Sequence, residues 1–517
     1  MAVESSVDGT APEKGLAKGT NWWGAFVIGL AGTILVTGIA PYVVQGTGAL
    51  GIILIGVMTI AGCFLCLCLA ELATIWPDRT GGIPSFATES FRPLVGDKAA
   101  RHIGGTSGWA YWLGWFPVAP INVILTASYL AVLFKFSPGH TIDPVGTTWG
   151  TPIGITIVGV CFALLLVIFI PSYLGIRLGA AFATVLGVLS MLPITAMIFL
   201  PFFKSGSLHW HNVAGFHTPS GVHLSAAFIA AWFFPILWNV IAMEAAACYV
   251  GECRGGARDA KIALTAEGIF GMFIYIATPL LFVAVLGLAL TSADPLTLYL
   301  SYTNHIFGPG SWEQWFIGIP LVLALALSVL NAIMGCGRSL YQAAADGQLP
   351  RWFEHTNRFG VPDYAMAFNV VCSALLVLLG SPVRIYIISN GGYLLSCLLA
   401  FGGYFVYRHL RPDVERPFRL PTFAKWGALA VFVIWTVIYF YGGWNSPNVV
   451  VGPGQGPWLY LLGLLIVALY APLYWWRAWQ DRKLAAAAAA GVPLAPAIAG
   501  PAVAGQTESA AEPPVAG

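Results

Sequence analysis

Long apolar runs of about 20 residues recur along the chain and alternate with short polar segments. A helix of that length crosses the hydrocarbon core of a bilayer, so each run predicts one membrane span. Twelve runs are found, at residues 22–45, 49–70, 107–134, 152–170, 178–203, 224–250, 262–290, 314–337, 364–383, 385–407, 426–444 and 457–476. The pattern predicts an all-α integral membrane protein with 12 transmembrane helices.

The composition agrees with this pattern. Of the 517 residues, 58% are hydrophobic and 9% are charged, whereas a soluble domain has about 25% charged residues. This excludes an ordinary soluble domain. The net charge of +2 provides no field that would attract nucleic acid. The nine cysteines lack the paired spacing of a secreted disulfide framework.

The positions of Lys and Arg predict the orientation of the helices. Twelve spans place both chain ends on one side of the membrane, and cytoplasmic segments carry an excess of positive residues. With both ends inside, only Lys135, Lys204 and Arg384 of the 24 Lys and Arg residues fall outside. We therefore expect a multi-pass protein of the plasma (inner) membrane with both termini in the cytoplasm.

The two end segments are expected to be disordered in the cytoplasm. Residues 1–20 are polar and lack the short apolar core and cleavage site of a signal peptide. Residues 484–517 start with an alanine run and continue with repeated Pro and Gly, which interrupt a helix and offer no surface for a core.

The first helix of each half of the chain contains helix-breaking residues at mid-membrane depth. Gly38 and Pro41 interrupt the first span, and Pro235 interrupts the sixth. A broken helix at that depth must line a cavity, because lipid cannot satisfy its free backbone groups, and transporters built from inverted repeats have this feature. The lengths of several loops also recur between the halves with their sides exchanged. The alternative is a pair of ordinary kinks, which membrane helices tolerate.

Four motifs then resemble those of the amino acid, polyamine and organocation (APC) permeases. The first two are similar to the end of the second helix and the sixth-helix exit of that family: Ala70-Glu71-Leu72 with Pro77 and Gly81-Gly82, and Glu244 to Glu252 with Arg258-Asp259-Ala260. The others are Arg338-Ser339-Leu340-Tyr341 through Ala345-Asp346-Gly347-Gln348-Leu349-Pro350, with Ala345 where Arg is usual, and Arg416-Pro417-Phe418-Arg419-Leu420-Pro421. The resemblance covers nearly all of the chain except its tails.

The resemblance implies a LeuT-like core of 5+5 helices in inverted repeats, plus two peripheral helices. Residues 21–203 would form the first repeat, 224–407 the second, and 424–477 helices 11 and 12. It also implies a secondary transporter that moves an amino acid or related amine by alternating access, by proton-coupled symport or by exchange. The expected partners are this small molecule, a coupling ion and the lipid bilayer.

The resemblance further implies a substrate site at the two breaks. The glycine-rich motif of the first helix falls on Val36, Thr37, Gly38 and Ile39, and that of the sixth on Ala242, Met243 and Glu244. Trp238 and Asn239, beside the second break, complete the predicted substrate-binding set. Val36 and Ala242 stand where glycine is usual and add bulk where backbone would approach the ligand.

Two coupling mechanisms remain open. Some proton-coupled relatives have a lysine in helix five, where this chain has Ser190. Ser190 and Ser328 could hold sodium, which prefers oxygen ligands, or each could bond only its own preceding turn. Glu244 is the other candidate, because an intramembrane carboxylate is costly and suggests a ligand, proton or ion path. Its alternative is a carboxyl that bonds a neighbouring helix.

The remaining polar residues have simpler interpretations. Glu267 is expected to reach the membrane interface. Glu71, Glu252 and Asp346 are expected to be solvated, with pairing to Arg79, Arg254 or Arg338 as an inner gate as the alternative. Trp109, Trp112 and Trp115 form a stripe typical of packing. Four histidines of one outside loop favour a solvated loop over a metal site: His209, His211, His217 and His223.

Several functional classes are disfavoured by the same sequence. No phosphate-binding G-x-x-x-x-G-K-[ST] motif is found, which argues against an ATP-driven pump. We expect no cofactor, no metal and no enzymatic activity, since the histidines lie far from Glu244 in the chain. A sodium-coupled transporter of another organic ion, a channel and a membrane-embedded enzyme are the alternatives.

Overall fold

The structure, a computed structural model, describes residues 20–33, 35–79, 81–174, 195–291 and 295–490. The α-helices are α1 (Trp22–Thr33), α2 (Val36–Thr47), α3 (Leu50–Ile75), α4 (Ile83–Trp115), α5 (Val118–Phe134), α6 (Gly146–Trp149), α7 (Ile155–Leu174), α9 (Ala226–Ile241), α10 (Gly256–Thr291), α11 (Leu298–Phe307), α12 (Trp312–Ala345), α13 (Asp363–Val377), α14 (Pro382–Leu410), α15 (Ala424–Val437), α16 (Gly443–Ser446), α17 (Trp458–Ala468) and α18 (Tyr470–Ala489).

Shorter elements complete the fold. The 3-10 helices are η1 (Leu200–Phe203), η2 (Trp210–Asn212), η3 (Ala214–Phe216), η4 (Ala242–Glu252) and η5 (Arg351–Glu354), and the π-helices are η6 (Ile438–Gly442) and η7 (Pro447–Val451). The strands β1 (Thr141–Ile142) and β2 (Ile153–Gly154) pair antiparallel. The described chain is therefore almost entirely helical, as the apolar pattern predicts.

Nine helices in the described part of the chain are long and apolar enough to cross a membrane. The other three expected spans account for the difference from 12. The first is divided into α1 and α2, the ninth is the 15-residue α13, and most of the fifth (178–203) lies outside the described residues. A multi-pass membrane protein is thus supported, while the full set of 12 spans stays a prediction.

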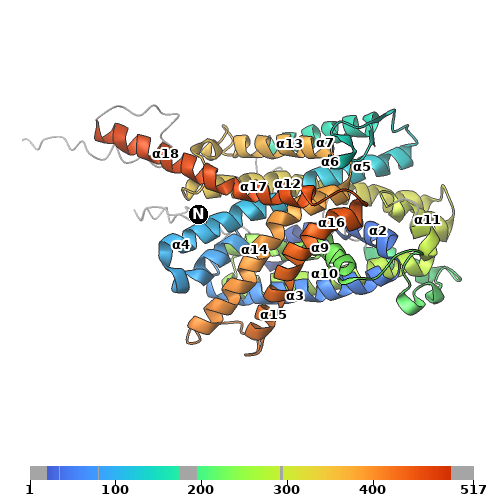
Figure 1. The fold of residues 1–517 in the computed structure, drawn as a ribbon, viewed down its shortest axis with the longest axis horizontal. Helices are drawn as coiled ribbons and strands as arrows, with labels where there is room; N and C mark the ends of the chain where they lie inside the picture. Colours follow the sequence, from blue (N-terminus) through green and yellow to red (C-terminus); the bar gives the residue numbers. More distant parts are fainter. Residues whose placement is uncertain (1–19, 34, 80, 175–194, 292–294, 491–517) are drawn as a thin grey trace, which may run out of the picture.

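Most helices run roughly along the long axis of the molecule (Figure 1). Helix α11 lies at one end, and α18 projects from the opposite end. The predicted orientation places residues 291–313 outside and the segment after 476 inside. The two helices lie at opposite ends, which either orientation in the membrane would allow, so the cytoplasmic placement of the termini stays a prediction.

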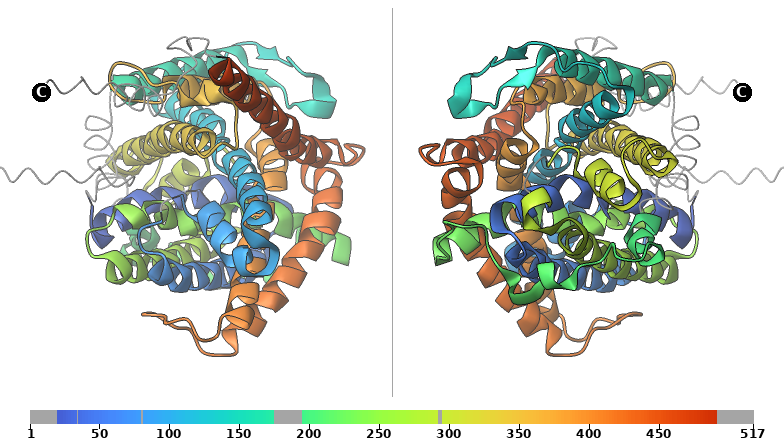
Figure 2. Two further views of the ribbon diagram at one scale, coloured as in Figure 1. Left: turned by 90° about the vertical axis from the view of Figure 1, so that its left-hand side faces the viewer. Right: turned by 90° about the vertical axis from the view of Figure 1, so that its right-hand side faces the viewer.

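The helices around the two expected breaks pack together. Viewed along the long axis, the blue helix α3 lies beside the green helices α9 and α10, and the orange and red helices α15 to α17 lie on an outer flank (Figure 2). The core between them contains fully buried aromatic side chains, among them Trp238, Tyr129, Tyr275, Tyr299, Tyr386 and Tyr393.

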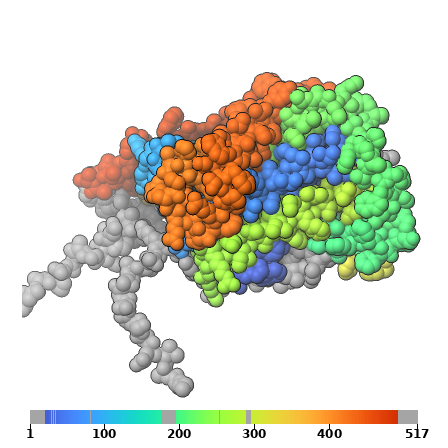
Figure 3. All heavy atoms as spheres, turned by 90° about the horizontal axis from the view of Figure 1, so that it is seen from below, coloured from blue at the N-terminus to red at the C-terminus, as the bar shows by residue number. Residues whose placement is uncertain are grey.

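One face of the bundle is apolar at its surface. Figure 3 shows a blue stripe of α3 bordered by yellow-green α10 and orange α14 and α15. Exposed large apolar side chains on these helices include Ile53, Val57, Ile60, Ile269, Phe273, Val433, Ile434 and Val437. A soluble protein rarely exposes such a patch. Lipid is the solvent that this face requires.

The expected inside loop at 71–106 is largely helical. Helix α4 begins at Ile83 and continues to Trp115, with a kink at Gly96, where φ is 77°. Its charged first half is stabilised by ion pairs one turn apart, Arg92 with Glu89 at 3.1 Å and Arg101 with Asp97 at 2.9 Å. The connection between the second and third spans is thus largely helical, which hydropathy does not predict because it identifies only apolar helices.

The boundary of the C-terminal tail also differs. Helix α18 continues through the alanine run to Ala489, five residues beyond the expected boundary at 484. Alanine has the highest helix propensity, which accounts for the extension. Residues 491–517 lie outside the described part of the chain.

Candidate functional site

The first break lies between α1 and α2. Helix α1 ends at Thr33, and α2 begins at Val36, so the break precedes Gly38 and Pro41, where it was expected. Pro41 lies inside α2, where membrane helices tolerate proline. The predicted residues Val36, Thr37, Gly38 and Ile39 form the first turn of α2 and are all buried. The N–H groups of Gly38 and Ile39 donate to Leu35 O, at 3.1 Å and 3.3 Å.

The second break is a change of helix type. Helix α9 starts at the cap Ser225, whose Oγ accepts from Phe228 N at 3.1 Å, and runs through Pro235 to Ile241. From Ala242 to Glu252 the backbone is a 3-10 helix, η4, of 11 residues. The expected break at 234–239 is therefore displaced by a few residues. A 3-10 run of this length is uncommon and often marks a functional hinge.

The two breaks meet at glycines of α1. A Cβ atom on Gly32 would collide with the carbonyl oxygen of Ala242, and one on Gly29 would lie 2.9 Å from Ala246 N. Close approach of α1 to η4 therefore depends on the missing side chains of Gly29 and Gly32. The effect of Ala242 on the approach of a ligand stays a prediction.

Glu244 is fully buried at the second break and is enclosed by aromatic residues. Its Oε1 atom accepts from the hydroxyls of Tyr111 at 2.9 Å and Tyr393 at 2.7 Å. Its Oε2 atom has no hydrogen-bond partner among the described residues. The Tyr111 ring lies 5.7 Å from that of Tyr393, and the Trp115 ring 6.2 Å from it. Oε2 therefore lies between aromatic walls, with the Trp115 indole N–H, which has no other partner among the described residues, within reach of the carboxylate.

Tyr111 and Tyr393 were not among the residues predicted from the sequence. Of the tryptophan stripe on α4, Trp109 and Trp112 point elsewhere, with Nε1 donating to Ile466 O at 2.7 Å and Asn369 Oδ1 at 2.6 Å. Tyr111 lies four residues before Trp115, on the same face of α4. A tyrosine at this spacing within an apolar span was the available signal.

Gly38 and Trp238 meet at Tyr386, a third residue that was not predicted from the sequence. Trp238 donates from Nε1 to Gly114 O at 2.9 Å, and its ring centroid lies 4.9 Å from that of Tyr386. A Cβ atom on Gly38 would collide with the Tyr386 hydroxyl. Tyr386 and Tyr393 are seven residues apart on α14, so one face of this helix serves both break regions.

Asn239 bonds within its own helix. Its Nδ2 donates to Pro235 O at 3.0 Å. In an α-helix this carbonyl accepts from the backbone N–H four residues later, which is that of Asn239 itself. Its Oδ1 atom has no hydrogen-bond partner within the described ranges. Asn239 therefore presents an acceptor beside Trp238.

Comparison with known proteins identifies the family. The model of the family described as amino acid permease matches residues 21–469 of the chain. The chain belongs to this family. The resemblance to APC permeases is thereby confirmed, and the family comprises transporters, not enzymes.

Several relatives of this permease have names that refer to polyamines or to arginine and ornithine. Polyamine transporter PUT1 of Oryza sativa subsp. japonica is 25% identical over 361 residues, or 69% of this chain and 60% of the rice protein. Polyamine transporter RMV1 of Arabidopsis thaliana is 24% identical over 358 residues, or 69% and 66%. A candidate arginine/ornithine antiporter of Escherichia coli K12 is 22% identical over 325 residues, or 61% and 64%. The permease thus spans less than two thirds of each relative's length.

Of the two serines predicted to hold sodium, the structure describes only Ser328. Ser190 lies outside the described residues of the permease. Ser328 Oγ donates to Ala324 O at 3.3 Å, the bond to the preceding turn that the alternative interpretation predicts. The sodium site remains a prediction.

Glu267 of the permease does not reach the membrane interface. It is fully buried, and its Oε2 accepts from the backbone N–H of Ala246 in η4 at 2.8 Å. The expectation was wrong because position along a span gives depth but not the direction in which the side chain points. Glu267 faces the second break.

Glu71 is also buried, and its partners are not the expected ones. Its Oε1 atom lies 3.1 Å from Arg416 Nε and 3.4 Å from Arg408 Nε. Its Oε2 atom accepts from Tyr404 Oη and from Leu420 N, both at 2.9 Å. The motif around Arg416 therefore closes over the end of α3. Burial lowers the pKa of the Arg416 guanidinium, and the Glu71 carboxylate opposes that shift.

The other residues of the predicted gate are separated from Glu71. Arg79 pairs with Glu89 at 2.6 Å. Asp346 accepts from Gln342 Nε2 at 2.9 Å, and partial burial raises the pKa of its carboxyl. The side chain of Glu252 lies outside the described set. The gate of Glu71 with Arg79 is therefore not formed.

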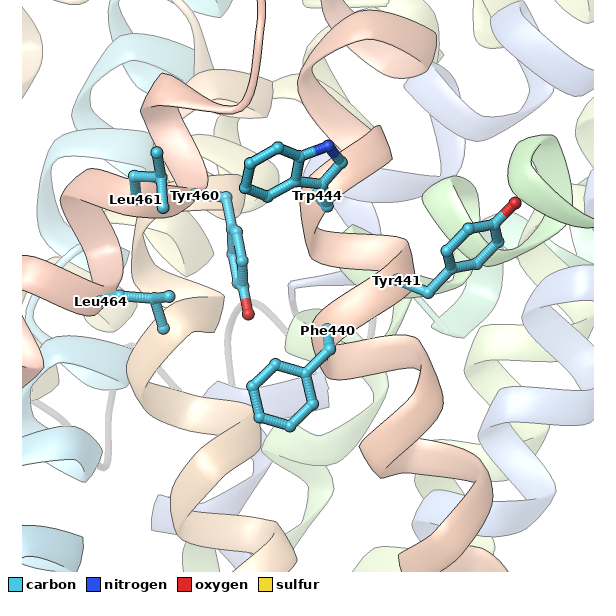
Figure 4. Close-up of a pocket in the computed structure, with 6 residues that line it drawn as sticks. All are labelled: Phe440, Tyr441, Trp444, Tyr460, Leu461 and Leu464. Atoms are coloured by element: carbon cyan, nitrogen blue, oxygen red, sulfur yellow. The ribbon is translucent and has the colours of Figure 1, made fainter.

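A surface groove of about 440 Å³ lies away from both breaks. In Figure 4, aromatic side chains of η6 and α16 and apolar side chains of α17 face this groove. Its lining is Phe440, Tyr441, Trp444, Tyr460, Leu461 and Leu464. No charged residue belongs to this lining, so it is suited to apolar groups and not to an ion.

Proposed function

We propose that the permease is a secondary transporter that carries a cationic amine across the plasma membrane. This amine is either a polyamine or a basic amino acid. Both termini face the cytoplasm. The substrate binds at the two helix breaks of an inverted-repeat core and crosses by alternating access. The names of the relatives support this class of substrate.

The Glu244 carboxylate carries the proposal. A buried charge is retained only where a partner compensates the cost of desolvation. Two tyrosine hydroxyls satisfy Oε1, whereas Oε2 has no partner among the described residues. An ammonium group provides the missing donor and the opposite charge. The faces of Tyr111, Trp115 and Tyr393 attract the same cation.

Coupling follows from competition at one carboxylate. A protonated Glu244 is neutral and loses its attraction for an ammonium, whereas an ionised Glu244 binds it. Proton release on one side therefore favours amine binding there, which supports exchange of a proton for the amine. Proton-coupled symport would need a second site for the proton. Sodium held near Ser190 and Ser328 is the alternative, and it predicts dependence on a sodium gradient instead.

Uptake by proteoliposomes tests the proposal. Radiolabelled putrescine, spermidine, arginine and ornithine are compared with leucine as a neutral control, under imposed proton or sodium gradients. We expect saturable, uphill uptake of cationic substrates driven by the proton gradient. Preference for leucine contradicts the proposed substrate class. Conductance without saturation indicates a channel, and chemical conversion of the substrate indicates an enzyme.

A further inference from the structure

Helix α10 contributes two buried polar side chains to the backbone of the two breaks. Glu267 and Tyr275 are eight residues apart, a spacing that places both on one broad face of a helix. Both are fully buried. Neither belongs to the predicted substrate set, so their role has to be found in what they contact.

Tyr275 joins the ends of two broken helices. Its hydroxyl lies 2.7 Å from Asn239 O and 3.2 Å from Gly32 O. These carbonyls lie in the last turns of α9 and α1, and each also accepts a backbone N–H, from Ala242 and from Leu35. The hydroxyl has one hydrogen, so Asn239 O is its nearer acceptor and Gly32 O a second, longer contact, and this side chain of α10 touches both helix ends.

Glu267 holds the segment beyond the second break. Its Oε2 accepts from Ala246 N at 2.8 Å, and its Oε1, beside Gly29 of α1, has no hydrogen-bond partner among the described residues. The titratable groups facing it are Cys63 and Cys66 of α3 and Glu244 of η4. The described surroundings thus offer this carboxylate a backbone donor and no counter-ion.

The bond to Ala246 bears directly on Glu244. The two residues are two positions apart in a 3-10 helix, which turns by about 120° per residue, so they face different sides of η4. Ala246 N points to α10, while the Glu244 side chain projects to Tyr111 and Tyr393. The bond from Ala246 N–H to Glu267 therefore also fixes the direction in which the Glu244 side chain projects.

The same segments are joined again further along the chain. Thr20, before α1, forms a β-bridge with Cys253, after η4, and Arg254 N donates to Thr20 O at 3.0 Å. Together with the glycine contacts, these bonds join α1, η4 and α10 into one unit.

We propose that Glu267 and Tyr275 are positioning residues of the transport site. They fix the backbone of both breaks so that Glu244 projects into its aromatic enclosure. Glu267 acts as an acceptor for Ala246 N–H and not as the carrier of the transported proton. The transport readout rests on the proposed function, whereas the backbone readout described next does not.

We call the hydrogen bonds that Glu267 and Tyr275 form with the backbone of the two breaks the clamp. Hydrogen–deuterium exchange of the purified full-length permease tests this clamp without a substrate. In Glu267→Ala we expect the peptide covering 242–252 to exchange about tenfold faster, because the N–H of Ala246 loses its acceptor. In Glu267→Gln, which keeps an acceptor oxygen, exchange stays within twofold of wild type. In Tyr275→Phe the peptide that includes Asn239 exchanges faster. Tyr302→Phe is the matched control, since Tyr302 is also buried and donates to a carbonyl, Met197 O at 3.4 Å.

Uptake kinetics separate positioning from proton transfer. We expect Glu267→Ala to raise the KM for the amine about tenfold with a smaller change in kcat. Glu267→Gln should restore the wild-type KM and the wild-type pH profile. Wild-type exchange in Glu267→Ala overturns the clamp, and an altered pH profile in Glu267→Gln overturns the positioning role. If wild type transports no amine, the exchange results still decide on the clamp.

Discussion

At the scale of single residues, the asymmetry of the Glu244 carboxylate has a direct consequence. One oxygen is bonded to two tyrosines and the other is open. Glu244→Gln keeps the size of the side chain and an acceptor for the tyrosines but removes the charge. Loss of one partner from a buried charge pair costs about 2–5 kcal/mol, so we expect KM for a cationic substrate to rise at least about 30-fold. Uphill accumulation should be lost as well.

Proteoliposome uptake across a range of pH measures this effect. Glu415→Gln removes the same charge from an exposed position and should behave as wild type. A detergent melting curve verifies that Glu244→Gln remains folded. If this variant still concentrates substrate with wild-type pH dependence, Glu244 is a packing residue.

Gly38 and Tyr386 allow a prediction with a built-in rescue. Any Cβ at Gly38 collides with the Tyr386 hydroxyl, while Leu125 Cδ1 at 3.3 Å and Tyr386 Cζ at 3.5 Å leave tolerable space. We expect Gly38→Ala to lower uptake about tenfold or more, because overpacking a buried site costs about 1–3 kcal/mol. Tyr386→Phe removes the colliding oxygen, so the double variant should recover most of that uptake.

Comparing Gly38→Ala, Tyr386→Phe and the double variant tests whether the collision with the Tyr386 hydroxyl causes the loss of uptake. Surface expression of Gly38→Ala should equal that of wild type. A double variant no better than Gly38→Ala alone means that the glycine is required for another reason, such as the backbone conformation at the break.

At the scale of elements, Glu71 fastens the loop between α14 and α15 to α3. Arg408 and Arg416 both lie beside this one carboxylate, and Phe418 N donates to Thr74 Oγ1 at 3.4 Å. Breaking a buried ion pair costs about 3–5 kcal/mol, because an uncompensated charge stays buried. We therefore expect Glu71→Gln to lower the melting temperature by several degrees, as measured by tryptophan fluorescence in detergent.

Arg411→Gln is the matched control for this loop. Arg411 is half exposed and lies 3.9 Å from Asp413, a surface pair worth about 0–1 kcal/mol. Equal effects of Glu71→Gln and Arg411→Gln on the melting temperature would show that the buried pairs contribute nothing special to stability.

Which elements form could be read from the sequence, but their contacts could not. Apolar runs predicted the spans, and the prolines and glycines of the first and sixth spans predicted that both would be broken. The break positions depend on tertiary contacts, such as that of Gly32 with the Ala242 carbonyl, which have no local signal. Pro41 and Pro235 suggested breaks a few residues away because proline disturbs the helix at its own position.

The candidate site shows the same division. Glu244 was found because a charge stands out in an apolar span, whereas Tyr111, Tyr386 and Tyr393 resemble the aromatic residues around them in the sequence. Glu267 and Glu71 were visible but misassigned, because pairing with Ala246 N or Arg416 requires knowledge of which helices are neighbours.

At the scale of the whole molecule, α18 is fastened at its start and free at its end. Arg477 donates to Ala344 O at 2.7 Å and pairs with Glu354 and Asp481, and Asp481 also pairs with Arg351 at 3.0 Å. A chain that ends at Ala490 keeps all of these contacts. We expect it to retain wild-type uptake and thermal stability.

A chain that ends at Trp476 is the matched comparison. It lacks Arg477 and Asp481, so the carbonyl of Ala344 and the Glu354 carboxylate lose a buried partner. Its melting temperature should fall by several degrees relative to the chain ending at Ala490. Equal stability of the two truncations, measured in the same detergent, contradicts the anchoring role of α18.

The 3-10 form of η4 is longer than an α-helix of the same residues would be. Its 11 residues rise about 22 Å at about 2.0 Å per residue, whereas an α-helix of the same residues rises about 16.5 Å. A return to α-helix would therefore shorten this half of the sixth span by about one helical turn, of about 5.4 Å pitch. Because Thr20 is bonded to the far end of η4, the start of α1 would be drawn along by the same distance. A change of helix type at the second break would therefore move the start of α1 along the helix axis by about one helical turn.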